Sequence, residues 1–142
     1  MIRYYSTAAV LGAGWFPVLL IPHITREWLL ADVPQNLGCL VAASIIVASA
    51  CRRFILRADT LSEHLVRATA MPYLGCIVFL SITAGILWAR SILSGGLANL
   101  HDTVSLYVMG LTATTVSLLV VIPYGLLCQY VLKSVSASAS SP

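Results

Sequence analysis

Charged residues are scarce in this chain of 142 residues. Asp, Glu, Lys and Arg together make up only 9% of it, with eight Lys plus Arg and five Asp plus Glu, whereas a soluble domain carries about a quarter. Hydrophobic residues make up 59%, and the mean hydropathy is +0.93. So few charges cannot cover so much apolar material with a water-facing surface, which excludes a soluble enzyme of this length. The net charge of +3 also excludes nucleic acid as a partner, because binding to phosphates requires a dense basic face.

The few charges leave uncharged runs that are long enough to cross a lipid bilayer. A crossing needs about 20 mostly apolar residues, because the hydrocarbon core is about 30 Å thick and a helix rises about 1.5 Å per residue. We therefore predict an all-α fold, an integral membrane bundle of four transmembrane helices within residues 1–133. The predicted crossings cover residues 4–25, 34–56, 68–89 and 103–132.

The basic residues predict how these helices are oriented. Four crossings place both termini on one side of the membrane, and six of the eight Lys and Arg residues fall on that side, leaving only Arg26 and Arg90 on the other. Basic residues favour the cytoplasm, so we expect both termini there, in a multi-pass protein of the cell membrane, which is the inner membrane in a bacterium. The first crossing is expected to be retained rather than cleaved as a signal peptide. The Ser-rich segment 134–142 has nothing to bury and is predicted to be disordered.

Local signals mark the ends of the third helix. Thr60 followed by Glu63 fits a capping box, which predicts a helix that begins near Thr60. Glu63 and Arg67 are four residues apart, in the order that favours an ion pair on a helix. The sequence Ser94-Gly95-Gly96 is expected to end that helix, because glycine accepts the left-handed conformation that closes helices.

Small residues recur four positions apart in every predicted crossing, a spacing that lets helices approach closely in lipid. The run 34–56 is the richest in small residues, so we expect it to be the central helix. This pattern favours a non-enzymatic accessory or anchoring subunit, with the lipid bilayer and other membrane subunits as its partners. The pairs are Ala8 and Gly12, Gly38 and Ala42, Ser81 and Gly85, and Gly110 and Thr114.

Three prolines, Pro17, Pro72 and Pro123, interrupt the apolar runs. Each removes a backbone donor, so we predict helix kinks at these positions, with one tilted helix over 103–132 kinked at Pro123. Interrupted membrane helices can line a solute site with freed backbone groups. A small carrier of apolar solutes that uses the kinked first and fourth helices is therefore one alternative function.

The apolar centres of the predicted crossings contain no Asp, Glu, Lys, Arg or His, which argues against a proton-coupled transporter, a pump or a voltage-gated channel. His23 and His101 fall at the outer ends of the first and fourth helices, where facing helices could supply two axial ligands to a haem. A haem- or quinone-binding redox anchor is thus the second alternative; neither histidine belongs to a recognised ligand motif, and we otherwise predict no cofactor or metal. No nucleophile elbow, zinc-protease motif, P-loop or dinucleotide fingerprint occurs, so an enzyme is not expected.

Overall fold

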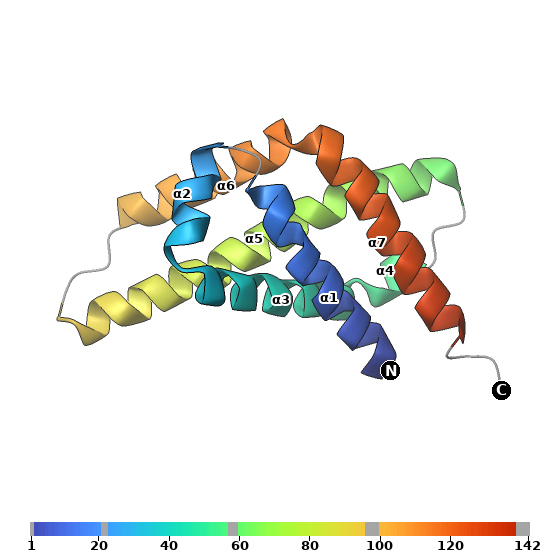
Figure 1. The fold of residues 1–142 in the computed structure, drawn as a ribbon, viewed down its shortest axis with the longest axis horizontal. Coiled ribbons are helices and arrows are strands. Elements are labelled where there is room, and N and C mark those ends of the chain that lie inside the picture. The colour runs from blue at the N-terminus through green and yellow to red at the C-terminus, as the bar shows by residue number, and fades with distance from the viewer. Residues whose placement is uncertain (1, 21–22, 57–59, 96–99, 139–142) are drawn as a thin grey trace.

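The computed structural model describes residues 2–20, 23–56, 60–95 and 100–138, and this part of the chain folds into helices (Figure 1). In chain order they are α1 (Ile2–Leu19), α2 (His23–Ala31), α3 (Val33–Ala50), α4 (Arg52–Leu56), α5 (Leu61–Leu93), α6 (Leu100–Val116) and α7 (Leu118–Ser138).

The chain runs four times along the long axis of the molecule. α1 leads away from the N-terminus, α3 returns, α5 leads away again, and α6 and α7 together return (Figure 1). Both termini and α4 therefore lie at one end of the molecule, which we call the terminal end. The opposite end carries α2, and we call it the α2 end.

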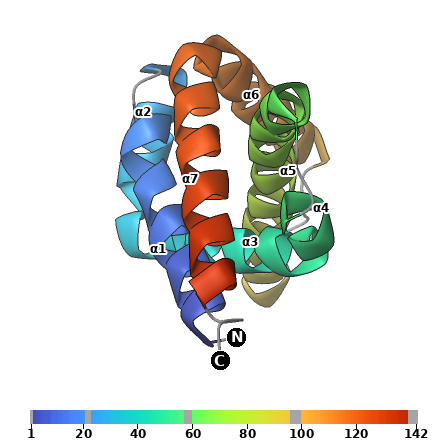
Figure 2. The ribbon, with the colours of Figure 1, turned by 90° about the vertical axis from the view of Figure 1, so that its right-hand side faces the viewer.

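Four helices form a ring in which each packs on the next: α1 on α3, α3 on α5, α5 on α7, and α7 on α1. In Figure 2, seen from the terminal end, α7 lies in front, with α1 on its left and α5 on its right. α6 packs on α5 and on α2. The run 34–56, which we expected to form the central helix, contributes α3, and α3 packs on α1, α2, α4 and α5.

Small residues allow close contacts at three places in this ring. On α1, Gly12 lies directly against Ser44 of α3, and on α6, Gly110 lies against Leu80 of α5. At the third place, a Cβ added to Gly125 of α7 would lie 2.7 Å from the carbonyl oxygen of Ala68 on α5. Two of the predicted small-residue pairs point elsewhere, since Gly38 and Gly85 are exposed and nothing lies within 4 Å of a Cβ added to either.

Three of the described helices are long and apolar enough to cross a membrane: Val33–Ala50, Leu61–Leu93 and Leu118–Ala137. The chain is therefore consistent with a helical membrane protein. α1 and α6 are not among these helices. α6 has only 17 residues, and the first turns of α1 contain the polar residues Arg3, Ser6 and Thr7, which lower its hydropathy. The predicted bundle of four transmembrane helices is therefore not confirmed, since the described residues form seven helices.

Two of the predicted crossings are divided. The run 34–56 ends as α3 at Ala50, where Cys51 caps the helix, and continues as the short α4. The run 103–132 is split at Ser117 into α6 and α7, which point in different directions (Figure 1). Just before this break, the hydroxyls of Thr114 and Thr115 donate to carbonyls one turn back, at 2.9 and 2.8 Å, and such bonds bend helices. The division therefore lies at Ser117, and Pro123 is inside the continuous α7.

Pro17 and Pro72 also lie inside continuous helices, α1 and α5.

The expected ends of the third helix are confirmed. The Thr60 hydroxyl accepts from the Glu63 amide at 3.3 Å at the start of α5, and Gly95 has a φ of +75° just after its end. The ion pair within the first turns is also confirmed, at 3.4 Å between Arg67 and the carboxylate four residues before it. α7 extends to Ser138, so the first residues of the predicted disordered tail are helical, whereas 139–142 lie outside the described residues.

Candidate functional site: a central apolar cavity

A cavity of about 130 Å³ occupies the middle of the ring. Side chains from α1, α2, α3, α5, α6 and α7 line it, and none of these lining residues, all of which the structure describes, is Asp, Glu, Lys, Arg or His. It extends from Leu29 at the α2 end to Leu132 at the terminal end. The site is therefore a largely apolar, partly open space that is lined by every long helix of the molecule.

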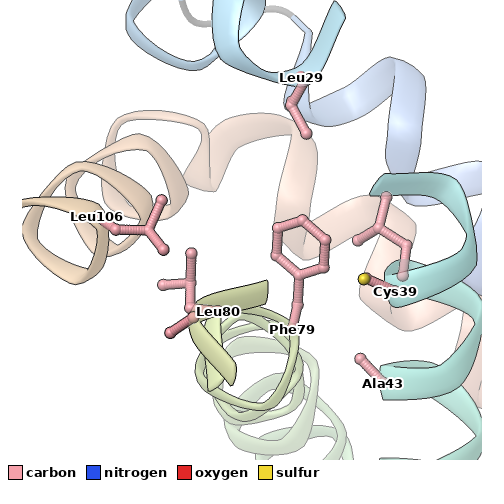
Figure 3. Packing of buried hydrophobic residues seen from close by; sticks show 8 residues of the cluster. Leu29, Cys39, Ala43, Phe79, Leu80 and Leu106 are labelled. Atoms are coloured by element: carbon pink, nitrogen blue, oxygen red, sulfur yellow. The ribbon is translucent and has the colours of Figure 1, made fainter. Parts of the chain in front are cut away.

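Leucine and phenylalanine side chains close the cavity at the α2 end. Figure 3 shows Leu29 of α2 pointing toward Phe79 and Leu80 of α5, with Leu106 of α6 beside them. Leu29 is only 1% exposed, and its carbonyl accepts a hydrogen bond of 3.1 Å from the side-chain amide of Asn36. This amide ties the end of α2 to the first turns of α3, so α2 is held as a cap over the cavity.

A second apolar cluster lies at the terminal end of the cavity. Tyr4, Ala8, Ala48 and Leu132 pack together there, and the Tyr4 hydroxyl donates to the carbonyl of Ala48 at 3.1 Å. The guanidinium of Arg52 lies 5.4 Å from the centre of the Tyr4 ring. The basic end of the molecule therefore lies directly outside this apolar closure.

The most polar side chain in the wall belongs to Gln129 of α7, which is 4% exposed. Its Oε1 lies 3.1 Å from Nδ1 of His64 on α5, and its Nε2 donates to the His64 carbonyl at 3.3 Å. Two hydrogen bonds to one residue fix the plane of this amide. Gln129 thus lines the cavity while its amide is held by His64 of α5, and the hydroxyl residues Ser44 and Thr114 also line this largely apolar space.

Glycine leaves part of the wall open. Gly75 of α5 lines the cavity, and nothing lies within 4 Å of a Cβ added to it. Sulfur atoms contribute to the wall nearby, from Met71, Cys76, Met109 and Cys128, and all four cysteines of the chain are free thiols. A larger residue in place of Gly75 would therefore extend into the cavity.

The predicted proline site is arranged differently from the expectation. Pro17 and Pro123 are exposed and do not line the cavity, whereas Pro72 does. The first helix and α7 still meet, through a hydrogen bond of 2.8 Å from the Tyr124 hydroxyl to the carbonyl of Leu11. Of these three prolines, the cavity thus includes only Pro72, which lies within the continuous α5.

The two predicted haem ligands lie near the α2 end. His101 is exposed and lies 3.8 Å from the carboxylate of Asp102, and α6, which carries it, packs on α2. The side chain of His23 lies outside the described residues, so the haem or quinone hypothesis stays a prediction. In the described parts of the chain, no three His, Cys, Asp or Glu residues come together in a way that could hold a metal ion.

Sequence reasoning missed Gln129 and its partner His64. Gln129 is a carboxamide within the uncharged run 103–132, and a buried carboxamide needs a hydrogen-bonding partner even though it carries no charge. Comparisons with family models, with curated proteins and with solved structures found no match to this chain.

Proposed function

We propose that this protein crosses the membrane four times and is a small carrier that binds an apolar solute in its central cavity. The cavity itself carries the proposal, because an apolar space of about 130 Å³ has the size of an engineered protein cavity, about 150 Å³, that takes up benzene or xenon. The sequence suggested that a solute would bind beside helices broken by proline. In this proposal the solute binds instead in the cavity between α1, α3, α5 and α7.

The path of the chain supports four crossings. α1, α3 and α5 alternate in direction, and α6 and α7 together complete the fourth passage (Figure 1). The charges of the described residues also separate by end: the terminal end carries five basic residues and one acidic, and the α2 end carries two basic and three acidic. This asymmetry favours a cytoplasmic terminal end in the cell membrane. The residues are Arg3, Arg52, Arg53, Arg67, Lys133 and Glu63 at the terminal end, and Arg26, Arg90, Glu27, Asp32 and Asp102 at the α2 end.

A cavity-filling variant tests the proposal. The protein in lipid nanodiscs is photolabelled with a six-carbon alkane that carries a diazirine, and the labelled peptides are mapped by mass spectrometry. We expect label at Met71 and Cys76 in the cavity, and we expect Gly75→Leu to remove it. Gly85→Leu is the matched control, because Gly85 lies on the same helix and faces outward with open space around it. Equal cavity labelling of both variants and the wild type would overturn the proposal.

The outer face of α5 favours a second candidate, the accessory or anchoring subunit. Gly85 and Ala89 are both exposed and lie four residues apart on this helix, a spacing that permits close packing of a further helix. The same pair of variants separates the two functions. If the chain is a subunit, Gly85→Leu should shift its native-gel band from the complex to the free protein, whereas Gly75→Leu should leave the complex intact.

A further inference from the structure

We infer that solutes enter the cavity from the lipid, sideways between α1 and α6, and that Leu29 of α2 is the gate of this entrance. This inference rests on the proposed function and names the route by which the same cavity is filled.

The first observation is which helices pack on each other around the cavity at the α2 end. α1 packs on α3, α3 on α5, and α5 on α6. α6 also packs on α7 and on α2, but among the described residues it has no extensive packing with α1, although both helices line the cavity. The cavity is partly open, and this is the side on which two helices of its wall are not packed together.

The terminal half of the same side is closed by α7. The ring of its Tyr124 meets the ring of Trp15 on α1 edge to face, with 4.6 Å between their centres, and its hydroxyl donates to the Leu11 carbonyl at 2.8 Å. Toward the α2 end α6 takes the place of α7 (Figure 1). There it packs on α5, where Gly110 lies directly against Leu80. The entrance therefore begins beyond Trp15, on the side of α2.

The side chains that border this entrance are apolar, so it leads to lipid. Trp15 and Leu19 of α1 line the cavity on one side, and Leu106 and Met109 of α6 line it on the other. Val108, next to Met109, is exposed on the outer face of α6. Between such surfaces the entrance faces the hydrocarbon of the bilayer, where an apolar solute is concentrated because it leaves water.

Leu29 blocks this path in the structure. α2 follows α1 in the chain and packs on α6 and α3, so it lies across the gap between α1 and α6. The buried Leu29 points from α2 toward Phe79 and Leu80 (Figure 3), and all three residues line the cavity. A leucine side chain is similar in width to an alkyl chain, so it fills the space that an entering chain would need.

The bond between Asn36 and Leu29 keeps the gate closed. The side-chain amide of Asn36 on α3 donates to the Leu29 carbonyl at 3.1 Å. α2 has only 9 residues, and a helix of this length is marginal by itself, so its position depends on contacts such as this one. Because Asn36 does not line the cavity, loss of this bond should release α2 and leave the cavity wall unchanged.

A phospholipid that carries a diazirine at the end of one acyl chain tests the route. Its headgroup holds it in the bilayer, so its chain can reach the cavity only from the lipid. In nanodiscs, label is read at Phe79 and Leu80, which are 3% and 2% exposed and are therefore shielded from the surrounding lipid. We expect background label there in the wild type and a severalfold gain in Leu29→Ala. Leu30→Ala is the matched control and should show no gain, because Leu30 is exposed and does not line the cavity.

Two substitutions on α6 test where the entrance lies. In the Leu29→Ala protein, Met109→Trp should narrow the gap between α1 and α6 and remove the gain in label. Val108→Trp adds the same side chain one residue earlier, on the exposed face that does not line the cavity, and should retain the gain. Equal label at Phe79 and Leu80 in these two proteins would contradict an entrance between α1 and α6.

Asn36→Leu provides a second test where Leu29→Ala fails to fold, and it should show the same gain in label. The inference is wrong if neither variant exceeds the wild type, if Leu30→Ala gains as much as Leu29→Ala, or if the wild type is already labelled as strongly as the variants. Failure of the proposed function looks different. The free six-carbon alkane should label Met71 and Cys76 by whichever route it enters, so loss of that label counts against the carrier itself.

Discussion

The contact between α5 and α7 predicts that Gly125→Ala destabilises the protein. An added Cβ would lie 2.7 Å from the carbonyl oxygen of Ala68 and 3.3 Å from its Cα. These are backbone atoms, so they cannot rotate away, and the two helices must separate by about 0.7 Å to restore an ordinary contact of 3.4 Å. One turn along both helices, the bonds between His64 and Gln129 already measure 3.1 and 3.3 Å, and this separation would stretch them beyond hydrogen-bond length.

The size of the effect follows from two opposing contributions. Overpacking costs about 1–3 kcal/mol, whereas replacing a glycine inside a helix by alanine gains up to about 1 kcal/mol. Gly38→Ala on α3 is the matched control, because nothing lies within 4 Å of its added Cβ, and it should only gain. The difference in free energy of unfolding between Gly125→Ala and Gly38→Ala is therefore expected to be about 1–3 kcal/mol.

Unfolding of the purified protein in mixed micelles, titrated with sodium dodecyl sulfate and followed by circular dichroism, measures this difference. Equal unfolding free energies for Gly125→Ala and Gly38→Ala would show that α5 and α7 do not approach as closely as the structure indicates.

Three further variants are expected to alter stability in the same assay. Asp32→Ala removes the side chain that accepts from an amide of the first turn of α3 at 3.2 Å, and should cost about 1 kcal/mol; no loss would contradict the cap. Tyr107→Phe removes a bond of 2.6 Å to Ser81 between α6 and α5. A double-mutant cycle with Ser81→Ala should give a coupling of about 0.6 kcal/mol, and a value of zero would refute the pair. Arg67→Met should cost about 1.5–3 kcal/mol, because this buried guanidinium bonds the last helical turn of α4. The exposed Arg53→Met should change stability by less than about 0.5 kcal/mol, and equal effects would argue against the anchor.

The sequence predicted those features of the fold that depend on neighbouring residues. Thr60 and Gly95 mark the ends of α5 because a cap and a left-handed glycine act within one turn of the helix. The divisions at Cys51 and Ser117 were missed for a different reason. Uncharged length gives no information about hydroxyl groups that bond their own helix, as Thr114 does before Ser117, and the predicted kink was placed at the proline instead.

The cavity could not be predicted because it depends on how the helices are aligned with one another. On antiparallel helices, Ala68 lies opposite Gly125, and His64, four residues earlier, lies opposite Gln129, four residues later. Once the glycine contact sets this alignment, the two polar residues must meet. Neither residue has a sequence neighbour that reveals its partner, so the spacing within each helix becomes informative only after the glycine contact is known. The prediction for Gly125→Ala therefore tests the alignment that brings Gln129 of α7 to His64 of α5.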